Sequence, residues 1–121
     1  MRAWQILGGE ELLAEARNAL ATVRDDMGSP ETYCLCHGEM GSADLLIYAA
    51  QVLGEEAWLA PAHAAAEEGI ERFERRRVPW PCGLRGANEI PGLMLGLAGI
   101  GHSYLRLADP RGTATVLLLG C

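Results

Sequence analysis

Two apolar stretches constrain the fold of this chain more than any other feature. Residues 43–53 read ADLLIYAAQVL and residues 92–107 read GLMLGLAGIGHSYLRL, so both are apolar almost all round. A helix of that kind belongs inside a protein, surrounded by other helices. Each stretch must therefore be enclosed, and the chain has only 121 residues with which to do so.

Two further stretches have the one-sided pattern that is typical of outer helices. In residues 12–24 and 55–77, apolar residues recur at helical spacing and charged residues lie between them. Pro61 is expected in the first turn of the second outer helix, where a missing N–H costs nothing, and Gly54 is expected to cap the inner helix before it. The pattern predicts an all-α fold in the order outer, inner, outer, inner, with a short β-like tail over residues 113–119.

Glycine loops open both apolar helices. Gly38-x-x-Gly41 comes before the first, and Gly92-x-x-x-Gly96 opens the second, with Pro91 expected at its first helical position. The pattern indicates a weak internal repeat of two helical hairpins. Two hairpins can hardly enclose two helices that are apolar on every side, so we expect the chain to oligomerise or to belong to a larger ring.

Charge and hydropathy exclude several classes of protein. A formal net charge of −6 argues against a phosphate-binding surface and hence against nucleic acid as a partner. The cluster Arg75-Arg76-Arg77 suits a helix C-terminus, where the helix dipole favours cations. The longest apolar run, residues 90–105, is broken by glycines and by His102, and it is shorter than the ~20 residues that a membrane span needs. No apolar segment follows Met1 as in a secretory signal, so we expect a cytoplasmic protein with reduced cysteines.

The feature that carries chemistry is the pair Cys36-His37 in the segment 36–41, CHGEMG. Thiolate and imidazole are ligands that zinc prefers, and the flanking glycines let the backbone turn sharply. We expect both residues to bind zinc; the alternative for Cys36 is a small buried hydrophobic residue. Cys34 could substitute for a third ligand, although a cysteine at that spacing is more often a spare thiol.

The remaining candidate residues are expected to have structural roles. No β-strand precedes the glycines of residues 92–101, which excludes a dinucleotide-binding loop. Five other residues are expected to have no catalytic role: His63 on an exposed helix face, His102 in the core, Cys121 as a free thiol, and Asp44 and Glu89 as charges near helix N-termini.

The segment Cys36-His37-Gly38-x-x-Gly41, with the apolar helix behind it, resembles the Cys-His-Gly motif of the lanthionine synthetase C-like family. Residues 91–101, PGLMLGLAGIG, and residues 105–110, LRLADP, look like the final segment of the cyclase domain of bifunctional class II lanthipeptide synthetases. Residues 116–119, VLLL, are similar to the end of that domain. By this resemblance, residues 1–121 look like the C-terminal portion of one cyclase domain.

The resemblance implies an α/α toroid, two concentric rings of helices with zinc at one mouth of the inner ring. This chain would supply a partial ring of about two hairpins. The implied activity is cyclisation, in which a cysteine thiol of a precursor peptide adds to a dehydroalanine or dehydrobutyrine and forms a thioether. Cys36 and His37 match the family's paired zinc ligands. The addition also needs a proton from a general acid, and the sequence does not identify a catalytic residue for that step.

The chain departs from the family pattern in two ways. The family takes a third ligand from an earlier Trp-Cys-x-Gly loop, whereas the similar letters Trp80-Pro81-Cys82-Gly83 follow the pair, where the family has a connector; Cys82 is therefore expected to be structural. The other ring helices and the acid/base residues would also lie upstream. An upstream cyclase or dehydratase segment, or a second copy, is thus expected as a partner beside the precursor peptide.

One alternative function comes from a different class. The missing third ligand also suits a non-catalytic helical module that binds peptide or completes a partner's ring. Another toroidal enzyme, such as a glycosidase, would need two opposed carboxylates, and no such pair stands out in the sequence.

Overall fold

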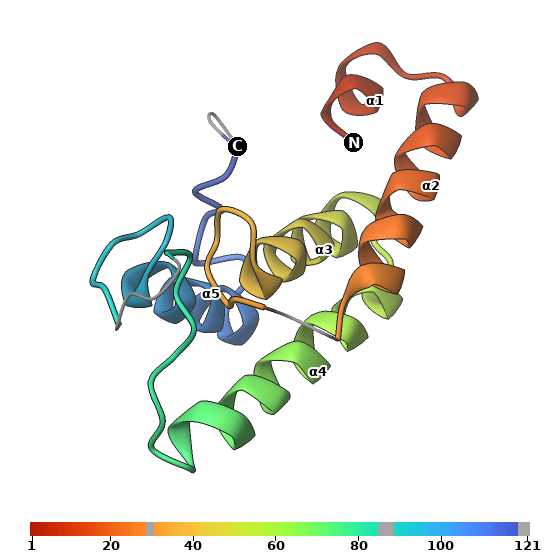
Figure 1. The fold of residues 1–121 in the computed structure, drawn as a ribbon. Helices are drawn as coiled ribbons and strands as arrows, with labels where there is room; N and C mark the ends of the chain where they lie inside the picture. The colour runs from red at the N-terminus through yellow and green to blue at the C-terminus, as the bar shows by residue number, and fades with distance from the viewer. Residues whose placement is uncertain (29–30, 85–88, 119–121) are drawn as a thin grey trace.

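The structure, a computed structural model, describes residues 1–28, 31–84 and 89–118. This part of the chain is helical and contains no strand, which confirms the predicted all-α class (Figure 1). The α-helices are α1 (Arg2–Leu7), α2 (Glu10–Asp26), α3 (Glu39–Leu53), α4 (Leu59–Gly69) and α5 (Leu97–Ala108), with a 3-10 turn at Glu56–Trp58 and a π-helical turn at Ile70–Glu74.

Helix α3 lies at the centre of the arrangement, as its composition predicts. It packs against α2, α4 and α5, which surround it in Figure 1. Met40, Ala43 and Ile47 are fully buried in one core cluster, and Leu46 and Ala49 on another side of the helix are fully buried in a second. Because α3 contributes to both clusters, it is buried on most of its circumference. Gly54 ends it in the left-handed conformation, at φ 68° and ψ 26°.

The outer helices are also confirmed, with one addition. On α2 just Ala16 and Leu20 are buried, so most of that helix faces solvent. Pro61 is the third residue of α4, in its first turn as predicted. The short helix α1 was not predicted, because it buries none of its residues and therefore shows no amphipathic pattern.

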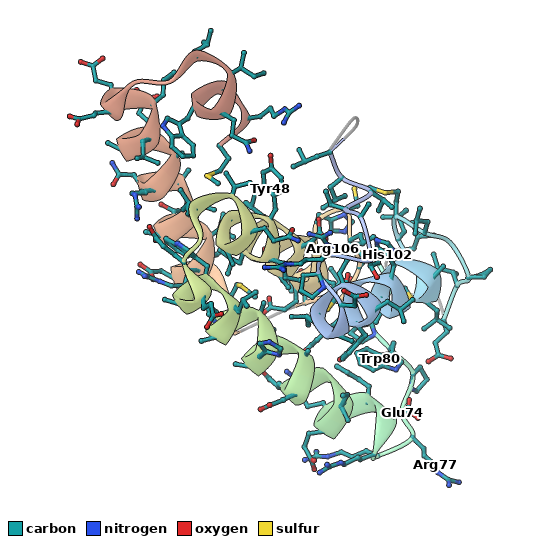
Figure 2. The ribbon with its side chains drawn as sticks, turned by 180° about the vertical axis from the view of Figure 1, so that it is seen from behind. Tyr48, Glu74, Arg77, Trp80, His102 and Arg106 are labelled. Carbon is teal, nitrogen blue, oxygen red and sulfur yellow. The ribbon has the colours of Figure 1, made fainter. Side chains whose placement is uncertain are left out.

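The arginine cluster lies at the end of the second outer helical segment, beyond the π-helical turn. Arg72 pairs with Glu68 at 2.8 Å and Arg75 pairs with Glu71 at 2.6 Å, both one helical turn apart. Arg77 has a positive φ of 52° and projects away from the molecule (Figure 2). These guanidinium groups lie near the C-terminal end of the helical segment, where the sequence places them and where the helix dipole favours cations.

The second inner helix differs from the prediction at its start. Helix α5 begins at Leu97, so Pro91 lies outside it, and residues 90–96 form a loop. The loop closes where the N–H of Leu97 donates to the carbonyl of Ile90 at 2.8 Å. A Cβ on Gly96 would lie 2.1 Å from that same carbonyl oxygen, so only glycine allows this approach.

Helix α5 is also not buried all round. Gly99, Ile100, Ser103 and Arg106 face the interior, whereas an apolar stripe of residues spaced one turn apart is exposed: Leu97, Gly101, Leu105 and Ala108. His102 is half-buried, and its Nε2 lies 3.1 Å from the carbonyl oxygen of Ala114, so the prediction of a core histidine is wrong. Helix α5 therefore has more apolar surface than the described part of the chain buries.

The internal repeat is real, but its register differs from the prediction. The N–H of Glu39 donates to the carbonyl of Thr32 at 3.0 Å, as Leu97 donates to Ile90. A Cβ on Gly41 would lie 2.2 Å from the carbonyl oxygen of Leu35, and one on Gly99 would lie 1.9 Å from that of Leu93. In each case the loop crosses the first turn of the helix that follows it. The matching motifs are therefore Gly38-x-x-Gly41 and Gly96-x-x-Gly99.

The predicted β-like tail is also corrected. Residues 113–118 form no strand, because the carbonyls of Thr113 and Ala114 face side chains of α5 rather than a neighbouring strand. Within the described ranges, each helix is too short or too polar to cross a membrane.

Candidate metal centre

Cys36 and His37 lie on the loop between α2 and α3, and backbone hydrogen bonds hold this loop against the second loop of the repeat and against the connector that contains Pro81. The N–H of Cys36 donates to the carbonyl of Met94 at 2.9 Å, and the N–H of Tyr33 donates to that of Pro81 at 2.9 Å. The N–H of Gly38 turns back to the carbonyl of Cys34 at 3.1 Å. The pair is thus presented by a fixed backbone rather than by a free loop.

Gly38 sets the sharp turn directly after the pair. A Cβ at this position would lie 2.6 Å from both the Cys34 nitrogen and the Thr32 oxygen. Its φ of −114° is ordinary, so the requirement for glycine is one of space. The turn brings Cys36 and His37 to the N-terminal end of the buried helix α3, as the sequence predicts.

Both side chains are exposed and line the same pocket of about 350 Å³. The rest of this pocket is mainly apolar, with Val23, Leu35, Leu45 and Leu117 in its wall. A thiol and an imidazole that share one open pocket are a suitable start for a zinc site. We call this the Cys-His pocket.

A second pocket of about 280 Å³ is also lined by His37 and is polar. Its wall includes the carboxylates of Asp26, Glu31 and Glu39. Glu39, the first residue of α3, is 6% exposed, and its carboxylate accepts a hydrogen bond from the N–H of Gly28 at 2.9 Å. Burial raises the pKa of Glu39, and the hydrogen bond from Gly28 opposes this effect. His37 therefore lines both an apolar pocket and an acidic one.

Cys34, two residues before Cys36 in the same loop, is completely buried. A Cβ on Gly83 would lie 2.9 Å from the sulfur of Cys34 and 3.1 Å from Cε1 of His37, so the glycine backbone packs closely against both. Over residues 1–28, 31–84 and 89–118, no three His, Cys, Asp or Glu side chains are grouped so that they could hold a metal. The residues present thus fit two ligands of a zinc site, and the third remains a prediction.

The other predicted residues lie elsewhere. His63 is exposed on α4, as expected, and Cys82 is buried in the connector after that helix. The carboxylate of Glu89 accepts a hydrogen bond from the N–H of Trp80 at 2.9 Å, so it ties the connector together rather than capping a helix. Cys121 lies outside the described residues.

A buried ion pair escaped the sequence analysis. Asp44 on α3 is 2% exposed and pairs with Arg106 on α5, which is 1% exposed. The ion pair gives Asp44 a more specific role than a charge near a helix N-terminus. Each residue is the lone charge in an apolar stretch, and charged residues are seldom buried without a partner. That signal could have suggested the pairing.

The family model for "Lanthionine synthetase C-like protein" matches residues 1–118 of this chain. The chain belongs to the lanthionine synthetase C-like family. Comparison with curated proteins and with solved structures gave no match. Membership agrees with the resemblance of the Cys-His-Gly loop and of the glycine-rich helix; the placement within class II synthetases stays a prediction.

Proposed function

We propose that this chain is the C-terminal portion of a zinc-dependent lanthionine cyclase domain. The reaction would join a cysteine thiol of a precursor peptide to a dehydroalanine or dehydrobutyrine of the same peptide, giving a thioether ring. One observation carries the proposal: Cys36 and His37 are exposed, are held by the backbone, and line one pocket at the start of α3. Family membership supports it.

In this proposal, Cys36 and His37 are zinc ligands and the Cys-His pocket receives the peptide. Zinc held there would keep the peptide's cysteine as a thiolate, which is the nucleophilic form. The fixed loop keeps the two ligands in one place, and the apolar wall limits the access of water to the reacting sulfur. The third protein ligand, the general acid and the rest of the toroid would come from an upstream segment or from a second copy.

Metal titration tests the proposal. We expect the full chain to bind Zn²⁺ at pH 7, and we expect Cys36→Ala and His37→Ala each to weaken that binding by more than about tenfold, since even the loss of a group that hydrogen-bonds a ligand costs about 10–100-fold. His63→Ala is the matched control, because His63 is also exposed but lies on α4 and lines neither of the pockets that His37 lines. Binding that is unchanged in Cys36→Ala and His37→Ala would overturn the metal assignment.

The second candidate is a non-catalytic helical module that binds peptide or completes a partner's ring. Two observations favour it: the third ligand is missing from the described residues, and the apolar stripe on α5 is exposed. Light scattering on the purified chain tests whether it needs a ring partner, and the zinc titration separates a metal centre from a non-catalytic module. A stable, well-folded monomer that binds zinc would remove the need for a ring partner.

A further inference from the structure

The tail segment, residues 113–117, is held against α3 and α5 by side chains. Arg106 donates from Nη1 to the carbonyl of Thr113 at 2.7 Å, and His102 Nε2 lies 3.1 Å from the carbonyl oxygen of Ala114. The hydroxyl of Thr115 donates to the carboxylate of Asp44. Arg106 and His102 both project from α5 (Figure 2). Three consecutive tail residues are thus anchored on two helices, α5 directly before the tail and α3 much earlier in the chain.

The anchor is the buried ion pair of Asp44 and Arg106. One oxygen of Asp44 faces the guanidinium of Arg106, and the other accepts the hydrogen bond from Thr115. Thr115 itself is 9% exposed. Hydrogen bonds that involve a buried charge are among the stronger ones in proteins, so the position of Thr115 is set firmly.

This anchor extends to the Cys-His pocket through Leu117. The hydroxyl of Thr115 also accepts a hydrogen bond from the N–H of Leu117 at 3.1 Å. Leu117 packs against the first core cluster and lines the pocket that Cys36 and His37 line. Its neighbour Val116 is 39% exposed and does not line the pocket.

We propose that Leu117 is a specificity-determining residue of the Cys-His pocket and that Asp44 and Thr115 position it. The assignment of the occupant rests on the proposed function. Beside Cys36 and His37 the pocket wall is mainly apolar, so it suits an apolar side chain next to the reacting cysteine of the peptide. A charged side chain there would lose water without gaining a partner in that wall.

Alkylation of Cys36 in the metal-free full chain tests whether Leu117 limits access to the Cys-His pocket. Of the three described cysteines, Cys36 is exposed and Cys34 and Cys82 are buried; Cys121→Ser gives a clean background, and mass spectrometry identifies the modified residue. The readout is the rate with bulky N-phenylmaleimide divided by the rate with small iodoacetamide. We expect Leu117→Ala to raise this ratio and Val116→Ala, the matched control, to leave it unchanged.

The anchor is tested by the same ratio. Thr115→Val keeps the shape of the side chain but loses both hydrogen bonds, one of them to a buried charge, so we expect the ratio to rise by about tenfold or more, as for the loss of a hydrogen bond to a charged group. Thr115→Ser keeps the hydroxyl and should restore the original ratio. An unchanged ratio in Leu117→Ala and Thr115→Val, with native circular dichroism, would overturn the proposal.

The occupant is tested by protection of Cys36 from iodoacetamide. The probes are two capped tripeptides with a central serine in place of the reacting cysteine, one flanked by leucines and one by lysines. We expect the leucine peptide to protect better, and we expect Leu117→Ala to abolish the difference. Equal protection, or better protection by the lysine peptide, would contradict an apolar occupant. Since neither assay uses zinc, a failed metal titration would leave this result standing, and the reverse also holds.

Discussion

Two tyrosines in one aromatic cluster differ in whether their hydroxyls find a partner. Tyr33 packs against Phe73 and Trp80 with ring centroids 5.2 and 5.5 Å apart, and Trp80 packs against Tyr104 at 5.9 Å. Tyr104 donates from its hydroxyl to the carbonyl of Ala66 at 2.8 Å. The hydroxyl of Tyr33 is buried and has no hydrogen-bond partner among the described residues. Burial raises the pKa of Tyr33 to about 12 and also raises that of Tyr104.

We therefore expect Tyr33→Phe to stabilise the fold by about 1 kcal/mol, because it removes a buried polar group that makes no hydrogen bond to any described residue. Tyr104→Phe is the matched comparison and should lower stability by about 1 kcal/mol, since it removes a hydrogen bond. Urea unfolding at pH 7 measures both. Destabilisation by Tyr33→Phe would show that its hydroxyl has a partner after all.

The raised pKa of Tyr33 also predicts that the stability of the fold depends on pH in the alkaline range. The pKa of Tyr33 rises from 10.0 to about 12 on folding, so the neutral phenol favours the native state. The contribution of the neutral phenol to the free energy of unfolding is fully present below pH ~10. It is lost as the pH rises from there towards ~12, because Tyr33 ionises at a lower pH in the unfolded chain than in the folded one. Between these values, stability should fall less steeply in Tyr33→Phe than in the wild type. Equal slopes in urea titrations would count against the buried, neutral tyrosine.

At the scale of the elements, two loops cross the first turns of α3 and α5 by the same close approach. Gly41 and Gly99 leave no room for a Cβ, whereas a Cβ on Gly101, inside α5, would meet no described atom within 4 Å beyond its chain neighbours and the nearby backbone of its own helix. We expect Gly41→Ala and Gly99→Ala to cost about 3 kcal/mol or more, because the clash is with backbone. Gly101→Ala should instead stabilise by about 1 kcal/mol through helix propensity. Thermal unfolding of the three variants checks the contrast.

The ion pair of Asp44 and Arg106 joins three elements, so its loss should be felt in all of them. We expect Asp44→Ala to cost about 3–5 kcal/mol, because it leaves the buried guanidinium without a countercharge. Glu71→Ala, which breaks an exposed pair on the second outer helix, should cost at most about 0.5 kcal/mol. Denaturant unfolding compares the two variants. A further change of Arg106 to Met in the Asp44→Ala protein should recover part of the loss, and no recovery would contradict the ion-pair explanation.

At the scale of the whole molecule, the exposed apolar stripe on α5 is a surface that suits a further helix. Leu105 is 63% exposed on this stripe, and Leu93 and Met94 in the loop before it are 43% and 42% exposed. Apolar surfaces of this kind favour association in water. We expect the purified chain to self-associate with rising concentration, and we expect Leu105→Glu to weaken that association while the helical circular dichroism stays the same. Leu105→Met is the matched control for light scattering; equal association of all three proteins would contradict the role of the stripe.

Much of the fold could be predicted because helix patterns report burial one element at a time. The apolar circumference of residues 43–53 predicted a central helix, and the one-sided pattern of residues 12–24 predicted an outer one. The start of α5 could not be predicted in this way, because residues 92–96 are as apolar as the helix and only the close approach to Ile90 turns them into a loop. The short helix α1 could not be predicted for the opposite reason: it buries none of its residues and so has no apolar pattern.

For the candidate site, residues close together in the sequence could be predicted, and partners far apart in the sequence could not. Adjacency in the chain placed Cys36 beside His37, and the following glycine explained why both precede a buried helix. That Leu117 shares their pocket, and that Asp44 meets Arg106 and Thr115, depends on residues more than sixty positions apart. The sequence alone therefore determined the helical class, the central position of residues 43–53 and the place of Cys36 and His37 before a buried helix, because each rests on neighbours within a few turns. Only the tertiary structure decided the register of the repeat, the buried ion pair and the wall of the pocket, because each arises where distant segments are packed together.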